Sequence, residues 1–393
     1  MNLAIDPRVN TQTAFSRGLT RACSTCGQHE PHESAVLSGQ APAPDAATVQ
    51  RDFLGWLGRM ERWVEAQPAA SLPEMISLYS TLYQASESQG VAMSPAGAAD
   101  VVKPPSPALT EQLKSFLPDR PFRISADHAD ELAQKLGISI EQLMVELIPL
   151  AKELARPPIS EYLVGAVGRG KSGDLFLGVN MEYGKQSLNQ TTHGEQFVVQ
   201  NAQNAGETGL VSLAISAPPC GHCRQFLNEL KGGLDLDILV PDMPRLKLRE
   251  LLPHDFGPHH LGIEGGLLTP QKHDLRLDHP DEATSAALSA ANESYVHHSK
   301  NPAGVAVVLK DGRIFTGAAL DNAAYNPSLN PLQAALMGLV RAKVDYSAIQ
   351  RVVLVEDANS KVSHDWATRG VIDSICPDAR YDHVQAQRAQ PAG

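Results

Sequence analysis

The chain has 393 residues, which at about 150 residues per domain corresponds to two or three domains. Its composition, 42% hydrophobic and 20% charged, is that of a globular protein and excludes disorder over the whole chain. A net charge of −11, no dense Lys/Arg cluster and no apolar run of about 18 residues argue against a nucleic acid, an anionic membrane surface or a membrane span.

The amino-terminal part of the chain changes character several times. Residues 1–50 are rich in Ser, Thr, Gln, Ala, Pro and Gly, and we expect most of them to be disordered. Residues 51–107 predict a helical extension followed by a linker, and residues 108–156 a helical N-terminal segment in which Pro149 kinks or restarts the last helix. Cys23 and Cys26 form a Cys-x-x-Cys pair, either a flexible thiol pair or a structural zinc site.

From residue 157 the pattern changes to alternating strands and helices. Short apolar runs predict strands over residues 162–170, 175–180, 210–216 and 237–240. Helices are predicted over residues 195–205, with Thr192 at the N-cap and Gly206 at the C-cap, and over residues 221–230. This order predicts an α/β fold, a three-layer α/β/α sandwich, for residues 157–270.

A second stretch, residues 280–387, repeats this pattern. Residues 165–183 align with residues 304–325 if the second copy carries three extra residues after its second strand. The predicted pairs are Asn180 with Asn322, Glu182 with Ala324 and Tyr183 with Tyr325. Because the framework is kept while polar residues change, we expect a duplicated fold in which the second module is a degenerate copy.

The residues with the clearest chemistry are His193, Glu195, Cys220 and Cys223. In the predicted sandwich, the helices after residues 193 and 220 begin side by side at one edge of the sheet. One imidazole and two thiolates suit Zn²⁺, and three protein ligands leave a fourth position for water, which is typical of a catalytic zinc. Helix N-termini favour thiolates. Glu195 can shuttle protons for the water that the zinc activates.

Other interpretations of these cysteines exist. A redox dithiol would need neither His193 nor Glu195, and a closed structural zinc site would need a fourth ligand. His222 lies between the two cysteines, but neighbours this close rarely fit one tetrahedron. The pattern His-x-Glu followed by Pro-Cys-x-x-Cys is the signature of zinc deaminases, so we favour a catalytic zinc.

Residues 109–387 resemble the bacterial two-module, homodimeric-type zinc-dependent cytidine deaminases. The resemblance is carried by the segments 178–183, 192–196, 219–226, 255–258 and 322–327. It implies hydrolytic deamination of cytidine and deoxycytidine in pyrimidine salvage, by a cytoplasmic homodimer that holds one zinc ion per chain. Gly194 departs from the family, which usually has Ala there, and Tyr162 and Tyr325 stand where Phe is common.

The resemblance also implies a role for individual residues. The implied metal ligands are His193, Cys220 and Cys223, with Glu195 as the catalytic residue. The implied substrate contacts are Asn180 and Glu182 to the ribose 3′-hydroxyl, Tyr162 and Phe256 to the pyrimidine, and Tyr325 to the neighbouring subunit's site.

The sequence leaves alternative functions open. The chain could deaminate a modified nucleoside or a cytosine in a polynucleotide, although its acidic balance weighs against a polynucleotide. It could also be an interaction protein or an injected bacterial effector, in which residues 1–100 bind a protein partner or serve as a non-cleaved export signal. We assign no role to His254, His259 and His260, and expect His297 and His298 at the surface.

Overall fold

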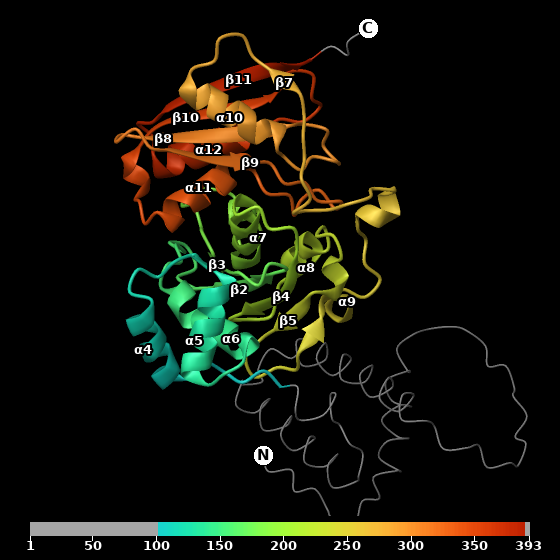
Figure 1. The fold of residues 1–393 in the computed structure, drawn as a ribbon. Helices are drawn as coiled ribbons and strands as arrows, with labels where there is room; N and C mark the ends of the chain where they lie inside the picture. Colours follow the sequence, from blue (N-terminus) through green and yellow to red (C-terminus); the bar gives the residue numbers. More distant parts are fainter. Residues whose placement is uncertain (1–100, 390–393) are drawn as a thin grey trace, which may run out of the picture. The chain divides into compact units, whose positions relative to one another are not determined.

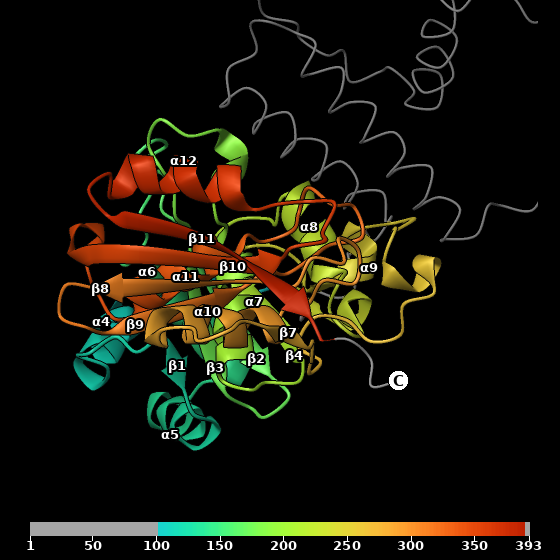
Figure 2. The ribbon, with the colours of Figure 1, turned by 90° about the horizontal axis from the view of Figure 1, so that it is seen from above.

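The structure, a computed structural model, describes residues 101–389 (Figures 1 and 2). The predictions for residues 1–100, including the Cys23–Cys26 pair, lie outside the described residues. In the described part, no helix has the length and apolar character needed to cross a membrane. The described residues form two sheets, each covered by helices, so the predicted duplicated α/β fold is confirmed.

The first module contains a mixed sheet with the strand order β1-β3-β2-β4-β5-β6. Its strands are β1 (Arg123–Ile124), β2 (Gly165–Gly170), β3 (Leu175–Val179), β4 (Leu210–Ile215), β5 (Asp237–Leu239) and β6 (Leu246–Lys247). Its helices are α4 (Pro107–Phe116), α5 (Ala126–Leu136), α6 (Ile140–Lys152), α7 (Gly194–Asn204), α8 (Gly221–Leu227) and α9 (Leu248–Leu251). β2 and β3 form the predicted antiparallel hairpin, and β4 and β5 are parallel.

Glycines in β2 and β3 let two helices lie directly on this sheet. A Cβ atom at Gly165 would be 2.5 Å from a backbone oxygen of α6, and one at Gly178 would be 2.3 Å from a backbone oxygen of α7. Gly178 pairs with Ala166, the neighbour of Gly165, and neighbouring residues of a strand point to opposite faces. Helices α6 and α7 therefore cover opposite faces, which gives three layers. Helix α6 continues through Pro149 and does not restart there.

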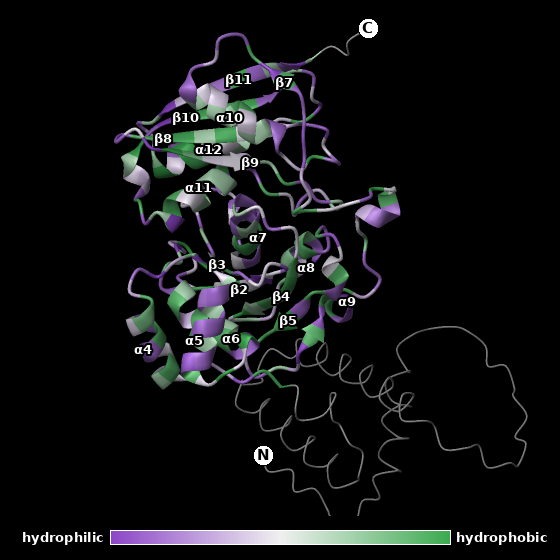
Figure 3. Cartoon of the chain, in the orientation of Figure 1, coloured by the Kyte–Doolittle hydropathy of each residue, from purple (hydrophilic) through white to green (hydrophobic). Residues whose placement is uncertain are grey.

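The second module repeats this arrangement in a sheet of order β7-β11-β10-β8-β9. Its elements are β7 (Leu275–Arg276), α10 (Glu282–Asn292), β8 (Ala303–Leu309), β9 (Ile314–Ala318), α11 (Pro331–Arg341), β10 (Ile349–Asp357), α12 (Asp365–Ile375) and β11 (Arg380–Arg388). A Cβ at Gly304 would meet α10 at 2.3 Å, and one at Gly317 would meet α11 at 2.2 Å. Strand β8 is hydrophobic along most of its length (Figure 3) and is almost entirely buried.

The duplication is confirmed, but the predicted pairing of residues after the second strand is wrong. Met181 forms bridges with Arg156 and Thr192, and Leu320 forms the equivalent bridges with Tyr295 and Leu329. These bridges superpose the two copies without an insertion. The structural pairs are Asn180 with Ala319, Glu182 with Asp321 and Tyr183 with Asn322.

Glu182 and Asp321, the carboxylates at equivalent positions of the two copies, accept the same kind of hydrogen bonds. Glu182 accepts hydrogen bonds from two successive backbone N–H groups, of Ile159 and Ser160. Asp321 accepts the equivalent pair from residues 298 and 299. The sequence alignment matched identical letters, Asn and Tyr, whereas the fold preserves the hydrogen-bonding carboxylate.

Two predicted helix boundaries also change. Helix α7 begins at Gly194 and its N-cap is His193, because Thr192 is instead paired with Met181 in a two-residue bridge. Helix α8 ends at Leu227, earlier than predicted. In both views α11 lies over α7 (Figures 1 and 2), and Gln333 at the start of α11 donates a hydrogen bond to the carbonyl of Gln190. The two modules therefore contact each other close to the beginning of α7.

Candidate metal centre and active site

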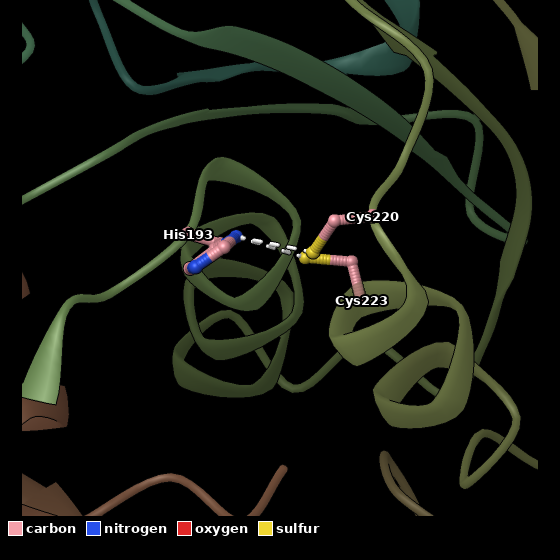
Figure 4. Close-up of side chains that lie close together, drawn as sticks. All are labelled: His193, Cys220 and Cys223. Atoms are coloured by element: carbon pink, nitrogen blue, oxygen red, sulfur yellow. Dashed lines mark hydrogen bonds between the residues drawn. The ribbon is translucent and has the colours of Figure 1, made fainter. Parts of the chain in front are cut away.

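Three predicted metal ligands meet where α7 and α8 begin. His193 is the N-cap of α7, Cys220 is the N-cap of α8, and Cys223 lies in the first turn of α8. The Nδ1 atom of His193 is 3.6 Å from Sγ of Cys220 and 3.3 Å from Sγ of Cys223. The three side chains point toward one another (Figure 4), and their donor atoms all lie within 4.8 Å of each other.

The spacing of these donors fits a zinc ion. With Zn–N and Zn–S bonds of about 2.0 and 2.3 Å, a tetrahedral ion holds nitrogen and sulfur about 3.5 Å apart. The two N···S separations quoted above are close to that value. His222, considered as a fourth ligand, instead stacks on His193 with 5.3 Å between ring centroids, and its Nε2 lies 3.3 Å from Nε2 of Gln196. The arrangement thus offers three protein donors, as a catalytic zinc site does.

Of the three donors, Cys220 favours a cation by its protonation state, whereas burial raises the pKa of the Cys223 thiol. A hydrogen bond from the buried Cys223 thiol lowers the pKa of Cys220 to about 3. The hydrogen bond between the Cys220 sulfur and the imidazole raises the pKa of His193. The cluster therefore places a thiolate sulfur in position to bind a positive charge, and the proton it attracts to His193 is one that a metal ion would displace.

Glu195 lies in the first turn of α7, two residues after His193, and only 3% of it is exposed. Burial raises the pKa of its carboxyl group, because the charged form loses solvation. A buried glutamate of this kind binds a proton more readily near neutral pH than an exposed one does. That property suits a group that accepts and returns protons.

Asn180 and Glu182 both hold the loop 157–164, which leads into β2. Asn180 accepts a hydrogen bond from the N–H of Val164 and donates one to the carbonyl of Tyr162, both at 2.9 Å. Glu182 accepts the two N–H bonds described above and a third bond, of 2.5 Å, from the Ser160 hydroxyl. Burial opposes ionisation of Glu182, but these bonds outweigh it and lower the pKa of the carboxyl group.

Nothing in the sequence indicated that Ser160 would hold Glu182. The three aromatic residues expected to contact substrate are all exposed: Tyr162, Phe256 and Tyr325. The carbonyl of Phe256 accepts a 2.7 Å hydrogen bond from Gln225, so its loop is attached to α8. Their contacts with substrate stay a prediction.

A second group of possible metal donors lies in the same loop. The donor atoms of Asp255, His259 and His260 lie within 4.8 Å of one another, although we expected no role for these histidines. His259 and His260 are exposed, and Nδ1 of His260 already accepts the N–H of Gly257. The three-donor site at α7 and α8, by contrast, includes the buried Cys223 and has the buried carboxylate of Glu195 beside it.

Two modules of one α/β fold, with a His-Cys-Cys site in the first, define a zinc-binding deaminase of the cytidine and deoxycytidylate type. The cytidine and deoxycytidylate deaminase zinc-binding region matches the chain twice, at residues 138–233 and 248–369. A cytidine deaminase of Aliivibrio fischeri is 39% identical over 261 residues, which cover 66% of this chain and 88% of that protein.

A second curated relative agrees with the first. A cytidine deaminase of Vibrio vulnificus strain YJ016 is 41% identical over 255 residues, which cover 65% of this chain and 86% of that protein. A solved cytidine deaminase of Mycobacterium tuberculosis is 36% identical, covers 27% of this chain and 89% of that chain, and has a TM-score of 0.25. The chain belongs to the cytidine deaminase family.

Proposed function

We propose that this chain catalyses the zinc-dependent hydrolytic deamination of cytidine and deoxycytidine to uridine and deoxyuridine, a reaction of pyrimidine salvage. The observation that carries the proposal is the meeting of His193, Cys220 and Cys223 at two helix N-termini, with the buried Glu195 beside them. Curated relatives about 40% identical to the chain are named cytidine deaminases, which supports the same activity here.

The residues divide the chemistry between them. His193, Cys220 and Cys223 would hold a zinc ion, which supplies Lewis-acid activation of water by lowering its pKa towards 7. Glu195 takes the proton that the attacking water loses and delivers it to N3 of the cytosine ring. As the C4–N bond breaks, Glu195 takes a second proton from the hydroxyl group now on C4 and passes it to the amino group, which leaves as ammonia. The raised pKa of Glu195 matches this exchange of protons near neutral pH.

Asn180 and Glu182 position the sugar end of the substrate in this proposal. A carboxylate offers about four acceptor sites, and three donors already use those of Glu182. One site is left for the ribose 3′-hydroxyl. By holding the loop 157–164 in place, both residues also orient Tyr162, which would lie against the pyrimidine together with Phe256.

The experiment that tests this function replaces the proton carrier. We expect Glu195→Gln to abolish ammonia release from cytidine while the zinc content stays that of the wild type. Glu207→Gln is the matched control. Glu207 is also a buried carboxylate, it accepts a hydrogen bond from Ser172, and it follows the C-terminal end of α7, away from the metal ligands. Wild-type turnover by Glu195→Gln would remove the proposed mechanism.

We also propose residues 157–270 as the catalytic module and residues 280–387 as its degenerate copy. The N-cap of α11 is Asn330 where α7 has His193, and Leu332 stands at the position of Glu195.

A homodimer in which Tyr325 reaches the neighbouring subunit's site is part of this proposal. Tyr325 is 72% exposed and has a φ of 64°, so its side chain is held out from the fold in a strained backbone conformation. Sedimentation of the wild type and of Tyr325→Ala tests the dimer, with a monomeric wild type as the contradicting result.

A further inference from the structure

Glu229, in the first module, is a carboxylate with no exposed surface whose side-chain partners all belong to the second module. Its Oε1 atom accepts a 2.7 Å hydrogen bond from the Tyr295 hydroxyl and lies 2.6 Å from Nε2 of His298. Its Oε2 atom accepts a 2.9 Å bond from the N–H of Ala323. A buried carboxylate is tolerated only when such partners satisfy it, so this network fixes the two modules in one relative position.

His298 was predicted to lie at the surface, and that prediction is wrong. Only 3% of its side chain is exposed, because the first module covers it. Tyr295 is buried as well, and its burial next to Glu229 raises the pKa of the hydroxyl group. The hydroxyl therefore keeps its proton and donates a hydrogen bond to Glu229 at all ordinary pH values.

The network is attached to the helix that carries two of the proposed zinc ligands. Glu229 follows the C-cap of α8, the helix that begins at Cys220 and contains Cys223. Gln225, between Cys223 and Glu229, makes a second connection to the other module. Its carbonyl accepts a 2.9 Å bond from Nδ2 of Asn322, and its side chain lies 3.3 Å from Oδ1 of the same residue.

Helix α8 depends on such contacts because it has only seven residues. A helix this short is not stable alone and takes its position from the structure around it. Its polar contacts along one side go to the second module, at Asn322 and at the partners of Glu229. The Gln225 side chain also holds the carbonyl of Phe256, so a movement of α8 would displace that loop as well.

We propose that Glu229 is a positioning residue through which the second module holds α8, and with it Cys223, in register with His193. The degenerate module then has a defined role, because it keeps the metal centre of the first module assembled. The effect on substrate turnover rests on the proposed function, whereas the effect on zinc retention does not.

The test compares two buried carboxylates in the full-length zinc-loaded protein. Glu356 is the matched control, because it is also buried but its partners all lie in the second module. Those partners are the Ser363 hydroxyl, the N–H of His364, Nε2 of His383 and Nδ2 of Asn301. The variants are Glu229→Gln, Glu356→Gln and Tyr295→Phe, and Tyr295→Phe decides the test if Glu229→Gln does not fold.

The measurements are the rate of zinc release to a chromogenic chelator, the thermal midpoint, and KM and kcat for cytidine. We expect Glu229→Gln and Tyr295→Phe to release zinc about 10-fold faster than the wild type, as the loss of a residue that supports a ligand does. KM for cytidine should also rise in these two variants, because the loop that carries Phe256 moves with α8. Glu356→Gln should lower the thermal midpoint and leave zinc release unchanged.

Two results would overturn the proposal. One is wild-type zinc release from both Glu229→Gln and Tyr295→Phe, which would leave Glu229 a merely stabilising residue. The other is equally fast release from Glu356→Gln, which would show a general effect of lost stability. A wild type that holds zinc without deaminating cytidine would refute the proposed function, and the zinc-release comparison would still decide the role of Glu229.

Discussion

Replacing Gly178 by alanine tests whether close packing of α7 on β3 sets the position of the metal ligands. The added Cβ would lie 2.3 Å from the carbonyl oxygen of Gly194 and 2.8 Å from the nitrogen of Val198, where ordinary contact begins at 3.4 Å. Helix α7 must therefore move by about 1 Å, at a cost of about 1–3 kcal/mol for overpacking. Such a shift exceeds the roughly 0.2 Å that metal–ligand distances tolerate, so His193 should lose its place around zinc.

The second module supplies a control with the same strain and no metal ligands. A Cβ at Gly317 would lie 2.2 Å from the backbone nitrogen of Ala335 in α11. We expect Gly178→Ala and Gly317→Ala to lower the thermal midpoint to a similar extent in calorimetry. Zinc content and cytidine turnover should fall strongly only in Gly178→Ala. If Gly178→Ala retains wild-type zinc, or Gly317→Ala loses as much, α7 packing does not position the site.

Three further outcomes follow from the site. Because the contact with Cys220 raises the pKa of His193, protons compete with zinc, and a chelator should remove zinc faster as the pH falls from about 8 to about 6; a rate independent of pH would contradict this. Ser160→Ala removes one hydrogen bond to Glu182, worth about 1 kcal/mol. KM for cytidine should therefore rise about 5-fold with little change in kcat. An unchanged KM would count against a role of the loop 157–164 in substrate binding. Cys376→Ala removes a buried thiol from the core and should cost about 1 kcal/mol of stability while zinc content stays constant; loss of zinc would show a ligand set different from ours.

The metal centre could be predicted from the sequence because its chemistry depends on residue type and on local helix geometry. A histidine and a cysteine that each precede a helix are brought together once the two helices begin at the same edge of a sheet. The order of strands and helices around His193 and Cys220 indicated that arrangement, and the structure confirms that these side chains meet.

The contacts between the modules could not be predicted in the same way. The pattern around His298 shows only that a helix has ended, and it contains no sign that Glu229, some 70 residues earlier in the chain, covers this histidine. The pairing of Glu182 with Asp321 was missed for a related reason. Backbone bridges determine which residues are equivalent in the two copies, whereas a sequence alignment favours identical residue types.

The zinc content of the purified full-length protein tests the central claim most directly. It should be measured in the wild type, in Cys220→Ala, and in a variant with Cys23 and Cys26 both replaced by alanine. We predict one zinc ion per chain in the wild type and in the double variant, and none in Cys220→Ala, which should also fail to deaminate cytidine. Full zinc occupancy in Cys220→Ala, or zinc lost only when Cys23 and Cys26 are replaced, would contradict the account.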